Sequence, residues 1–191
     1  MKKQSLLKVI LSGVVGLFGA LAFFLSFGAK LNISYHGETG SYNGIIWGCK
    51  SLTEGGKTYQ ISEMGIPGVD KFQPAVLPLI GLFLILLGVI AAVLVGLLVK
   101  KPWAKWVVVA CAVVVLTGAV FQFFAYGSFV RAYVDTIAKA EGITATDEMY
   151  KEAKAQIDVY NPKAIMSTLC GVFGIIAGLA AGVVPFLPEK K

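Results

Sequence analysis

Charge is missing from four long stretches of this 191-residue chain. The stretches Val9–Ala29, Pro74–Val99, Trp106–Val130 and Ala164–Leu187 contain no Asp, Glu, Lys, Arg or His. About 20 apolar helical residues cross a bilayer core roughly 30 Å thick, and a spanning helix satisfies its own backbone hydrogen bonds in hydrocarbon. Each stretch therefore predicts a membrane-spanning helix. A hydrophobic content of 57% and a mean hydropathy of +0.76 argue against a soluble domain.

Side chains that carry out chemistry are also scarce. His36 is the only histidine, and no carboxylate cluster stands near it at metal-ligand spacing, so the sequence predicts no metal site. Cys49 is the only cysteine outside the charge-free stretches, and a packed thiol or an intermolecular bridge is favoured over a reactive Cys49–His36 pair. Glycine-rich phosphate loops and serine-nucleophile motifs are missing. We therefore expect no catalytic residue and no cofactor, and thus a protein that is not an enzyme.

The lack of ionisable side chains in the four stretches also argues against some kinds of membrane protein. Proton relays and ion paths keep such groups inside the membrane because their mechanisms need them. The sequence therefore disfavours an ion-coupled transporter or an intramembrane enzyme acting alone. Gln122 is the most polar side chain of the third stretch, and an interhelical hydrogen bond is favoured over a substrate contact.

The net charge of +6 is concentrated at the chain ends and in one short link. Dense lysine in short loops marks the cytoplasmic side of a membrane protein. We therefore expect both termini in the cytoplasm and the loops 30–73 and 131–163, where nine basic residues face ten acidic ones, outside. The charge indicates topology and contact with membrane lipid rather than nucleic-acid binding. The clustered lysines are Lys2, Lys3, Lys8, Lys100, Lys101, Lys105, Lys190 and Lys191.

Two questions of context stay open. Met1–Lys8, the apolar Val9–Gly19 and Ala20-Leu21-Ala22 are also typical of a cleaved signal peptide. Phe23–Phe27 continues the apolar run to full membrane length, which favours an uncleaved span. Lysine outnumbers arginine sixteen to one, which favours a bacterial cell membrane, with a eukaryotic plasma membrane as the alternative.

Small residues recur every four positions on three of the stretches. In lipid, helices associate through close backbone approach at such residues. Packing within one bundle is favoured, and a homo-oligomer interface on the fourth stretch is the alternative. The helix-packing candidates are Gly174, Gly178 and Gly182 on the fourth stretch, Gly88, Ala92 and Gly96 on the second, and Ser12, Gly16 and Ala20 on the first.

The first long loop has the period of β-strands. Leu31–His36, Ile45–Cys49 and Thr58–Ile61 are predicted strands, and Gly37–Gly44 is predicted as a turn. Glu54-Gly55-Gly56-Lys57 predicts a hairpin turn. A small antiparallel sheet of three or four strands follows, supported by the helix ends.

The second long loop is predicted to be helical. Arg131–Glu141 continues the third span, and Thr144 with Asp147 has capping-box spacing for a further helix. Met149, Ala153, Ile157 and Tyr160 share one face of that helix, which covers the sheet or the bundle, or alternatively binds a partner. The predicted fold is one all-α transmembrane domain, residues 1–191: a four-helix bundle with a small extracellular antiparallel sheet and a short extracellular helix.

This layout resembles the claudin and peripheral-myelin-protein superfamily. The shared features are four spans, internal termini, a β-rich first outer loop and an extended third helix. Of that family's tryptophan and two-cysteine loop motif, Trp47-Gly48-Cys49 matches one part, at closer spacing, and a second loop cysteine is absent. The resemblance implies lateral assembly and adhesion or barrier-type contacts through the outer loops.

The aromatic and cysteine side chains that could make specific contacts lie in the predicted outer loops. Tyr35, Trp47, Cys49 and Tyr59 are the candidate extracellular contact residues, while the spans are apolar. We expect a non-enzymatic four-span membrane protein whose outer β/α region contacts another copy or a membrane-protein partner. The alternative is an accessory membrane subunit of a transport or export complex, and a small membrane enzyme is the weakest hypothesis.

Overall fold

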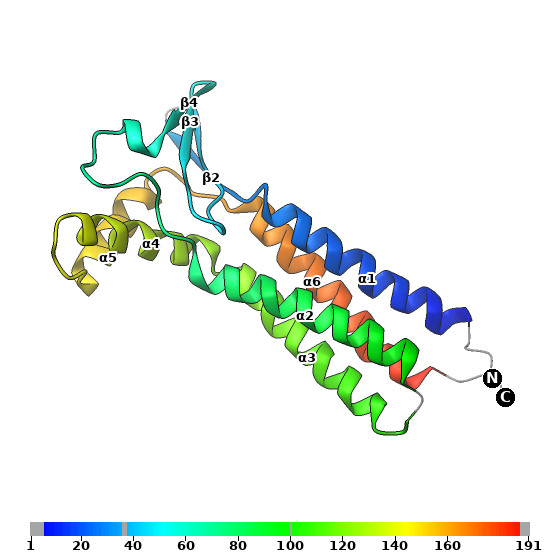
Figure 1. Cartoon of the computed structure of the whole chain (residues 1–191). Coiled ribbons are helices and arrows are strands. Elements are labelled where there is room, and N and C mark those ends of the chain that lie inside the picture. Colours follow the sequence, from blue (N-terminus) through cyan, green and yellow to red (C-terminus); the bar gives the residue numbers. More distant parts are fainter. Residues whose placement is uncertain (1–5, 36–37, 100, 188–191) are drawn as a thin grey trace. The chain divides into compact units, whose positions relative to one another are not determined.

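The computed structural model describes residues 6–35, 38–99 and 101–187, and most of these residues are helical (Figure 1). Its residues form two compact units. We name Met1–Phe24, Ile80–Gln122 and Leu169–Lys191 the bundle, and Leu25–Leu79 and Phe123–Thr168 the cap. The helices are α1 (Leu6–Ser26), α2 (Val76–Leu98), α3 (Ala104–Gln122), α4 (Ala125–Ala140), α5 (Asp147–Asp158) and α6 (Ile165–Val183), with 3-10 turns η1 (Ile61–Glu63) and η2 (Val184–Phe186).

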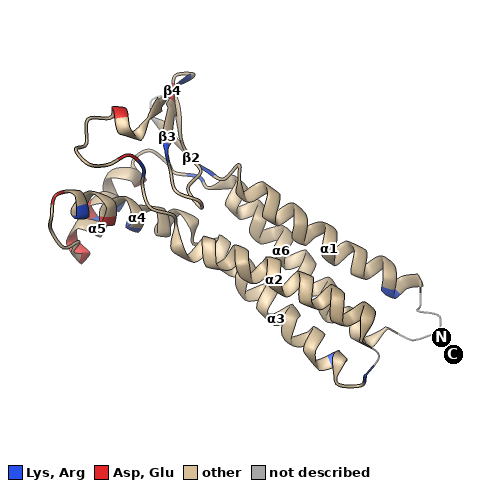
Figure 2. Ribbon diagram, in the orientation of Figure 1, with Lys and Arg blue, Asp and Glu red and all other residues tan. Residues whose placement is uncertain are grey.

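Four helices are long and apolar enough to cross a membrane: α1, α2, α3, and α6 with η2. They lie side by side in Figure 1, and Figure 2 shows no charged residue along their middle parts. Only 28% to 44% of the residues in these windows are buried inside the protein. Many of the other apolar side chains, such as Leu17, Leu87 and Leu179, are exposed, as in a bundle solvated by lipid. The chain therefore has the architecture of a multi-pass integral membrane protein, as the sequence predicts.

One predicted span is too long. We expect the third span to reach Val130, but α3 ends at Gln122 and a turn at Phe123–Phe124 separates it from α4. The apolar run continues past this turn because Phe129 and Val130 belong to the buried core of the cap. The run is therefore uncharged for two different reasons. Before the turn its residues face lipid, and after the turn they are buried inside the cap.

Glycine sets the closest helix contact in the bundle. A Cβ added to Gly81 of α2 would lie 2.5 Å from the carbonyl oxygen of Gly118 of α3. A Cβ added to Gly118 would lie 2.9 Å from Leu84 Cβ and 3.0 Å from Ile85 N. Only glycine permits this approach, which brings the backbones of α2 and α3 into direct contact. The periodicity argument does not single out either residue.

The small residues of α6 and α2 that the sequence singles out face other helices of the bundle. A Cβ on Gly174 would lie 2.9 Å from Ala119 Cβ, and one on Gly178 2.8 Å from Leu116 Cγ. A Cβ on Gly88 would lie 2.7 Å from Val115 Cγ2, and Ala92 is buried. Gly96 and Gly182 have only ordinary contacts, near 3.7 to 3.8 Å, and Gly16 has none within 4 Å. Contacts within one chain therefore account for the tightest part of the stripe on α6.

The cap contains a four-stranded antiparallel sheet in the order β1-β2-β3-β4. The strands are β1 (Lys30–Tyr35), β2 (Glu38–Asn43), β3 (Ser51–Glu54) and β4 (Lys57–Gln60). The predicted hairpin at Glu54–Lys57 is confirmed, since Gly55 and Gly56 adopt positive φ angles of 54° and 77° between β3 and β4. Such a pair of left-handed residues matches the twist of the flanking strands.

Two predictions for the first loop, one of a turn and one of a strand, are wrong. The segment predicted as a turn at Gly37–Gly44 contains β2, and the predicted strand Ile45–Cys49 forms turns and irregular chain. Ile45 and Ile46 are fully buried without being in a strand, so their hydrophobicity reports the interior of the cap. Gly44 and Gly48, with φ angles of 76° and 105°, bend the chain on either side of them.

The prediction that the second loop is helical is right, but the predicted start of α5 is wrong. Thr146, not Thr144, caps this helix by accepting a hydrogen bond from the Met149 N–H (3.4 Å). Since α5 contains no buried residue, hydrophobicity does not fix its start. Met149, Ala153 and Ile157 are half-buried on the predicted face, and Tyr160 lies beyond the helix end and is exposed.

Candidate functional site

The cap has an aromatic core of its own. The ring centroids of Tyr42 and Phe129 lie 5.2 Å apart, and those of Phe72 and Tyr133 lie 4.9 Å apart. Phe72 also contacts Phe129 edge-on, at 6.3 Å. These residues join β2, the segment before α2, and α4, and tilted or edge-on aromatic pairs add to the hydrophobic gain. The sheet and α4 therefore form one packed body on which surface features are held in place.

The segment that leads into α2 is also fixed to α4. The Gln73 N–H donates to Thr136 Oγ1 (3.1 Å), and the same hydroxyl donates to the Ala132 carbonyl (2.6 Å). Burial raises the pKa of Tyr42 to about 12, with smaller contributions from neighbours such as Tyr133 and Cys49. The phenol is therefore neutral at physiological pH and serves the core rather than proton transfer.

Cys49 lies in the interior of the cap. Its side chain has no exposed surface, and its Sγ donates to the Ser51 carbonyl oxygen at 3.4 Å. Burial raises the pKa of this thiol to about 11. A neutral, covered thiol is a poor nucleophile, so the structure favours a packed thiol over an intermolecular bridge or a surface contact.

Trp47 is half-buried and contacts the last residue of α1 and the residue that follows it. Its ring stacks on Phe27 with centroids 5.1 Å apart and an interplanar angle of 4°. The indole N–H donates to Ser26 Oγ at 3.1 Å. These contacts attach the loop after β2 to the first residues of the cap, which is a structural role that the sequence does not reveal.

The other two contact candidates lie on strands. Tyr35 is the last residue of β1, opposite Glu38, and its side chain lies outside the described part of the structure. Tyr59 is on β4 and is 43% exposed. Tyr59 is thus the sequence-predicted contact residue that the structure places at the surface of the cap. His36 lies outside the described residues, among which no group of three potential metal ligands occurs.

The two edges of the sheet differ. At the β1 edge, Asn32 and Lys163 exchange two main-chain hydrogen bonds (2.9 and 2.8 Å), and the Ser34 N–H donates to the Tyr160 carbonyl (2.6 Å). At the other edge, all four residues of β4 are exposed. Within residues 38–99 and 101–187, no further strand pairs with β4.

The register of the hairpin identifies the groups presented at the β4 edge. Ile61 N–H bonds the Lys50 carbonyl (2.8 Å), and antiparallel ladders alternate bonded and non-bonded pairs. The pairs Leu52–Tyr59 and Glu54–Lys57 therefore bond within the hairpin, whereas the backbone groups of Thr58 and Gln60 point away from β3. Glu63 Oε2 accepts the Gln60 N–H at 3.0 Å. Within the described ranges no group bonds the N–H or C=O of Thr58, which leaves both for another chain.

Polar contacts hold α5 against α4. The Tyr126 hydroxyl donates to Asp158 Oδ1 (2.6 Å), and the Lys154 ammonium donates to Asp158 Oδ2 (3.1 Å). Burial and the bond to Asp158 raise the pKa of Tyr126, and the bonds from Tyr126 and Lys154 lower that of Asp158. The Tyr150 hydroxyl donates to Asp135. Since α5 buries no residue completely, these bonds attach it to α4 together with its half-buried apolar face.

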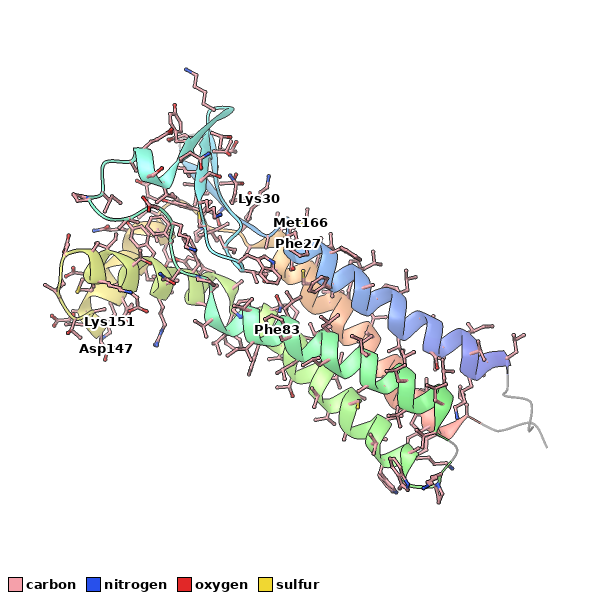
Figure 3. All side chains as sticks on the ribbon, viewed as in Figure 1. Phe27, Lys30, Phe83, Asp147, Lys151 and Met166 are labelled. Carbon is pink, nitrogen blue, oxygen red and sulfur yellow. The ribbon has the colours of Figure 1, made fainter. Side chains whose placement is uncertain are left out.

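A groove of about 500 Å³ runs between α4 and α5. Its basic residues are Arg131 on α4 and Lys151 and Lys154 on α5, and its apolar residues include Leu77 and Phe124. Figure 3 labels Lys151 among the side chains of α5. The Arg131 guanidinium carbon lies 5.4 Å from the centre of the Tyr150 ring. The sequence shows these cations only as a solvated helix face, because their meeting depends on how α4 and α5 pack.

Comparison with known proteins assigns no family: no family model, no curated protein and no solved structure matches this chain. Function must therefore be argued from the geometry of the bundle and the cap.

Proposed function

We propose that this protein is a non-enzymatic four-span protein of the cell membrane whose β/α cap contacts a second copy or a membrane-protein partner outside the cytoplasm. The observation that carries this proposal is the difference between the two edges of the cap sheet. An exposed strand edge is a template for another chain, and proteins that do not use one cover or disrupt it. Here the segment at Tyr160–Lys163 covers β1, and β4 has no such cover among the described residues.

The β4 edge offers a small and specific contact by strand addition, in which main-chain bonds give affinity and alternate side chains give selectivity. The Thr58 N–H and C=O provide two main-chain bonds, each contributing about 0.5–1.5 kcal/mol. Tyr59 adds an exposed aromatic ring, of the type enriched where interfaces bury most surface. Because β4 has only four residues, we propose a weak lateral contact that membrane confinement assists.

The claudin-like layout supports the same kind of function, since it implies lateral contacts through outer loops. The charge distribution supports the orientation. Lys8, Lys101 and Lys105 line one hollow of the bundle, together with residues near the end of α6, so the described basic residues of the α1 start and the α2–α3 link meet at one end. By the positive-inside rule that end faces the cytoplasm.

Cross-linking at the β4 edge tests the proposed function. Tyr59→Cys, in a chain with Cys111→Ala and Cys170→Ala, is treated in native membranes with a short bis-maleimide. We expect a cross-linked dimer or a defined heavier product, which Thr58→Pro abolishes by removing the edge N–H. Thr58→Val is the matched control, because it keeps that N–H and is expected to retain the product.

Two results contradict the proposal. Product yields that are equal for Thr58→Pro and Thr58→Val show that the β4 edge takes no part. Membrane subunits that co-purify in mild detergent and survive Thr58→Pro support the accessory-subunit alternative, in which the bundle makes the contact.

A further inference from the structure

The groove between α4 and α5 begins where two spans end. Leu77 is the second residue of α2, and Phe124 follows the last residue of α3 by two positions. Both side chains line the groove, and they are 40% and 54% exposed. Since α2 and α3 are membrane-spanning helices, their ends mark the boundary between hydrocarbon and headgroups. One wall of the groove therefore offers apolar surface at the depth of lipid acyl chains.

The basic residues lie within reach of lipid headgroups. Arg131 follows Phe124 by seven residues along α4, a distance of about 10 Å at 1.5 Å per residue. The polar region of each leaflet extends roughly 5–8 Å beyond the hydrocarbon. A long Arg or Lys side chain can reach across the gap between its Cα position and the headgroup region. Its charged group extends toward the interface while its stem packs on apolar surface.

Two of the three cations lack an acidic partner in the part of the chain that the structure describes. In the described residues, no carboxylate oxygen lies within 4.0 Å of the Arg131 or Lys151 side-chain nitrogens, whereas Lys154 is paired with Asp158. Asp135, one turn along α4 from Arg131, accepts the Tyr150 hydroxyl. The acidic residues of α5 at Asp147, Glu148 and Glu152 do not line the groove. The groove itself therefore has a surplus of positive charge.

Arg131 is also restrained by an aromatic neighbour. Its guanidinium carbon lies 5.4 Å from the centre of the Tyr150 ring, a cation–π contact. A planar guanidinium can donate two parallel hydrogen bonds to one phosphate. The Lys151 ammonium adds a second charge from the facing helix. A volume of about 500 Å³ is within the range of sites that hold small molecules.

We propose that this groove binds the phosphate headgroup of an anionic phospholipid from the adjoining leaflet, with Arg131 and Lys151 as ligands of the phosphate and Leu77 and Phe124 against the acyl chains. The proposal does not depend on the β4 edge. It assigns the groove to lipid rather than to a soluble phosphate because its apolar wall lies at the span ends. Bound lipid would join α5, which has no buried residue, to the membrane surface.

Lipid retention tests this proposal. The full chain is purified, placed in nanodiscs with defined fractions of phosphatidylglycerol in phosphatidylcholine, and analysed by native mass spectrometry for bound phosphatidylglycerol. The double variant Arg131→Gln, Lys151→Gln is expected to bind about 30-fold more weakly, since each charge near an anionic surface contributes about fivefold. Lys139→Gln removes a charge from α4 away from the groove and is expected to bind as the parent does.

Three outcomes overturn the proposal. Equal retention by the parent and the double variant excludes the two ligands. Equal losses in the double variant and in Lys139→Gln indicate a diffuse surface charge. Competition by soluble glycerol phosphate at the lipid's own concentration assigns the groove to a soluble anion. If the double variant misfolds, Arg131→Lys replaces it, and binding weakened with the charge kept supports the paired guanidinium contact.

Discussion

The bundle and the cap are stabilised by different kinds of side-chain packing. In the bundle, helices approach at glycine and alanine, and large side chains such as Leu87 and Leu179 face outward. In the cap, Phe72 and Phe129 are buried against other aromatic rings, and the described Lys, Asp and Glu side chains are exposed; Figure 2 shows where these charged residues lie along the chain. Lipid solvates apolar surface, so bundle helices gain mainly from close packing, whereas the cap gains from removing aromatic surface from water. The two units should therefore respond to opposite kinds of substitution.

The largest effect is expected from truncating a large side chain in the cap. Phe129→Ala removes a fully buried ring that contacts Tyr42 and Phe72, and it should destabilise the cap by about 3–5 kcal/mol. Hydrogen exchange should report faster exchange in β2 and α4 and unchanged protection in α3. Phe123→Ala, at an exposed position outside the groove, is the control. Equal effects of the two variants would show that the cap has no packed core.

The opposite change, from small to slightly larger, should damage the bundle. Gly118→Ala places a Cβ against the backbone of Gly81 and should cost about 2 kcal/mol through overpacking. Gly13 has nothing within 4 Å, so Gly13→Ala should be neutral or stabilising by the helix preference of alanine. Thermal unfolding in detergent, followed by circular dichroism, compares them. An unfolding temperature that Gly118→Ala leaves unchanged would contradict the close contact of α2 and α3.

A smaller effect is expected at the indole hydrogen bond of the cap. Trp47→Phe keeps a ring for stacking on Phe27 but removes the donor to Ser26, which should cost about 1 kcal/mol. Trp106, which is 73% exposed on α3, is the matched site, and Trp106→Phe should leave stability unchanged. Similar losses from both substitutions would indicate a general effect of tryptophan rather than this bond.

The smallest effect is a pH dependence confined to α5. The pKa of Asp158 lies below its ordinary value of 3.8, because Tyr126 and Lys154 bond the carboxylate. Its contribution is complete above that value and is lost as the pH falls through the lowered pKa. Protection of the α5 amides, measured relative to their intrinsic exchange rates at each pH, should therefore fall at low pH. Tyr126→Phe should accelerate exchange near neutral pH and weaken the acid dependence, and an unchanged acid dependence in that variant would exclude the bond as its cause.

The same contrast explains which features the sequence reveals. A lipid-facing helix needs about 20 uncharged residues, so the four spans can be predicted from composition, and the left-handed turn at Gly55-Gly56 reveals the β3–β4 hairpin. Burial inside a protein also produces uncharged runs. For that reason Ile45–Ile46 imitate a strand, and the buried start of α4 imitates the end of a span.

The sequence likewise reveals only part of the candidate sites. Tyr59 can be recognised from strand alternation, and the structure places it at the surface. The burial of Cys49, the contact of Gly81 with Gly118, and the meeting of Arg131 with Lys151 depend on how distant segments pack, which residue spacing does not encode.

Cysteine accessibility in intact cells tests the proposed orientation most directly. Tyr59→Cys and Lys105→Cys are compared in a chain with Cys111→Ala and Cys170→Ala, using a maleimide that cannot cross the membrane. The buried Cys49 should react slowly in both. The account predicts labelling of position 59 in intact cells and of position 105 only after the membrane is opened. Labelling of position 105 but not position 59 in intact cells would show that the cap faces the cytoplasm and would contradict the proposed function.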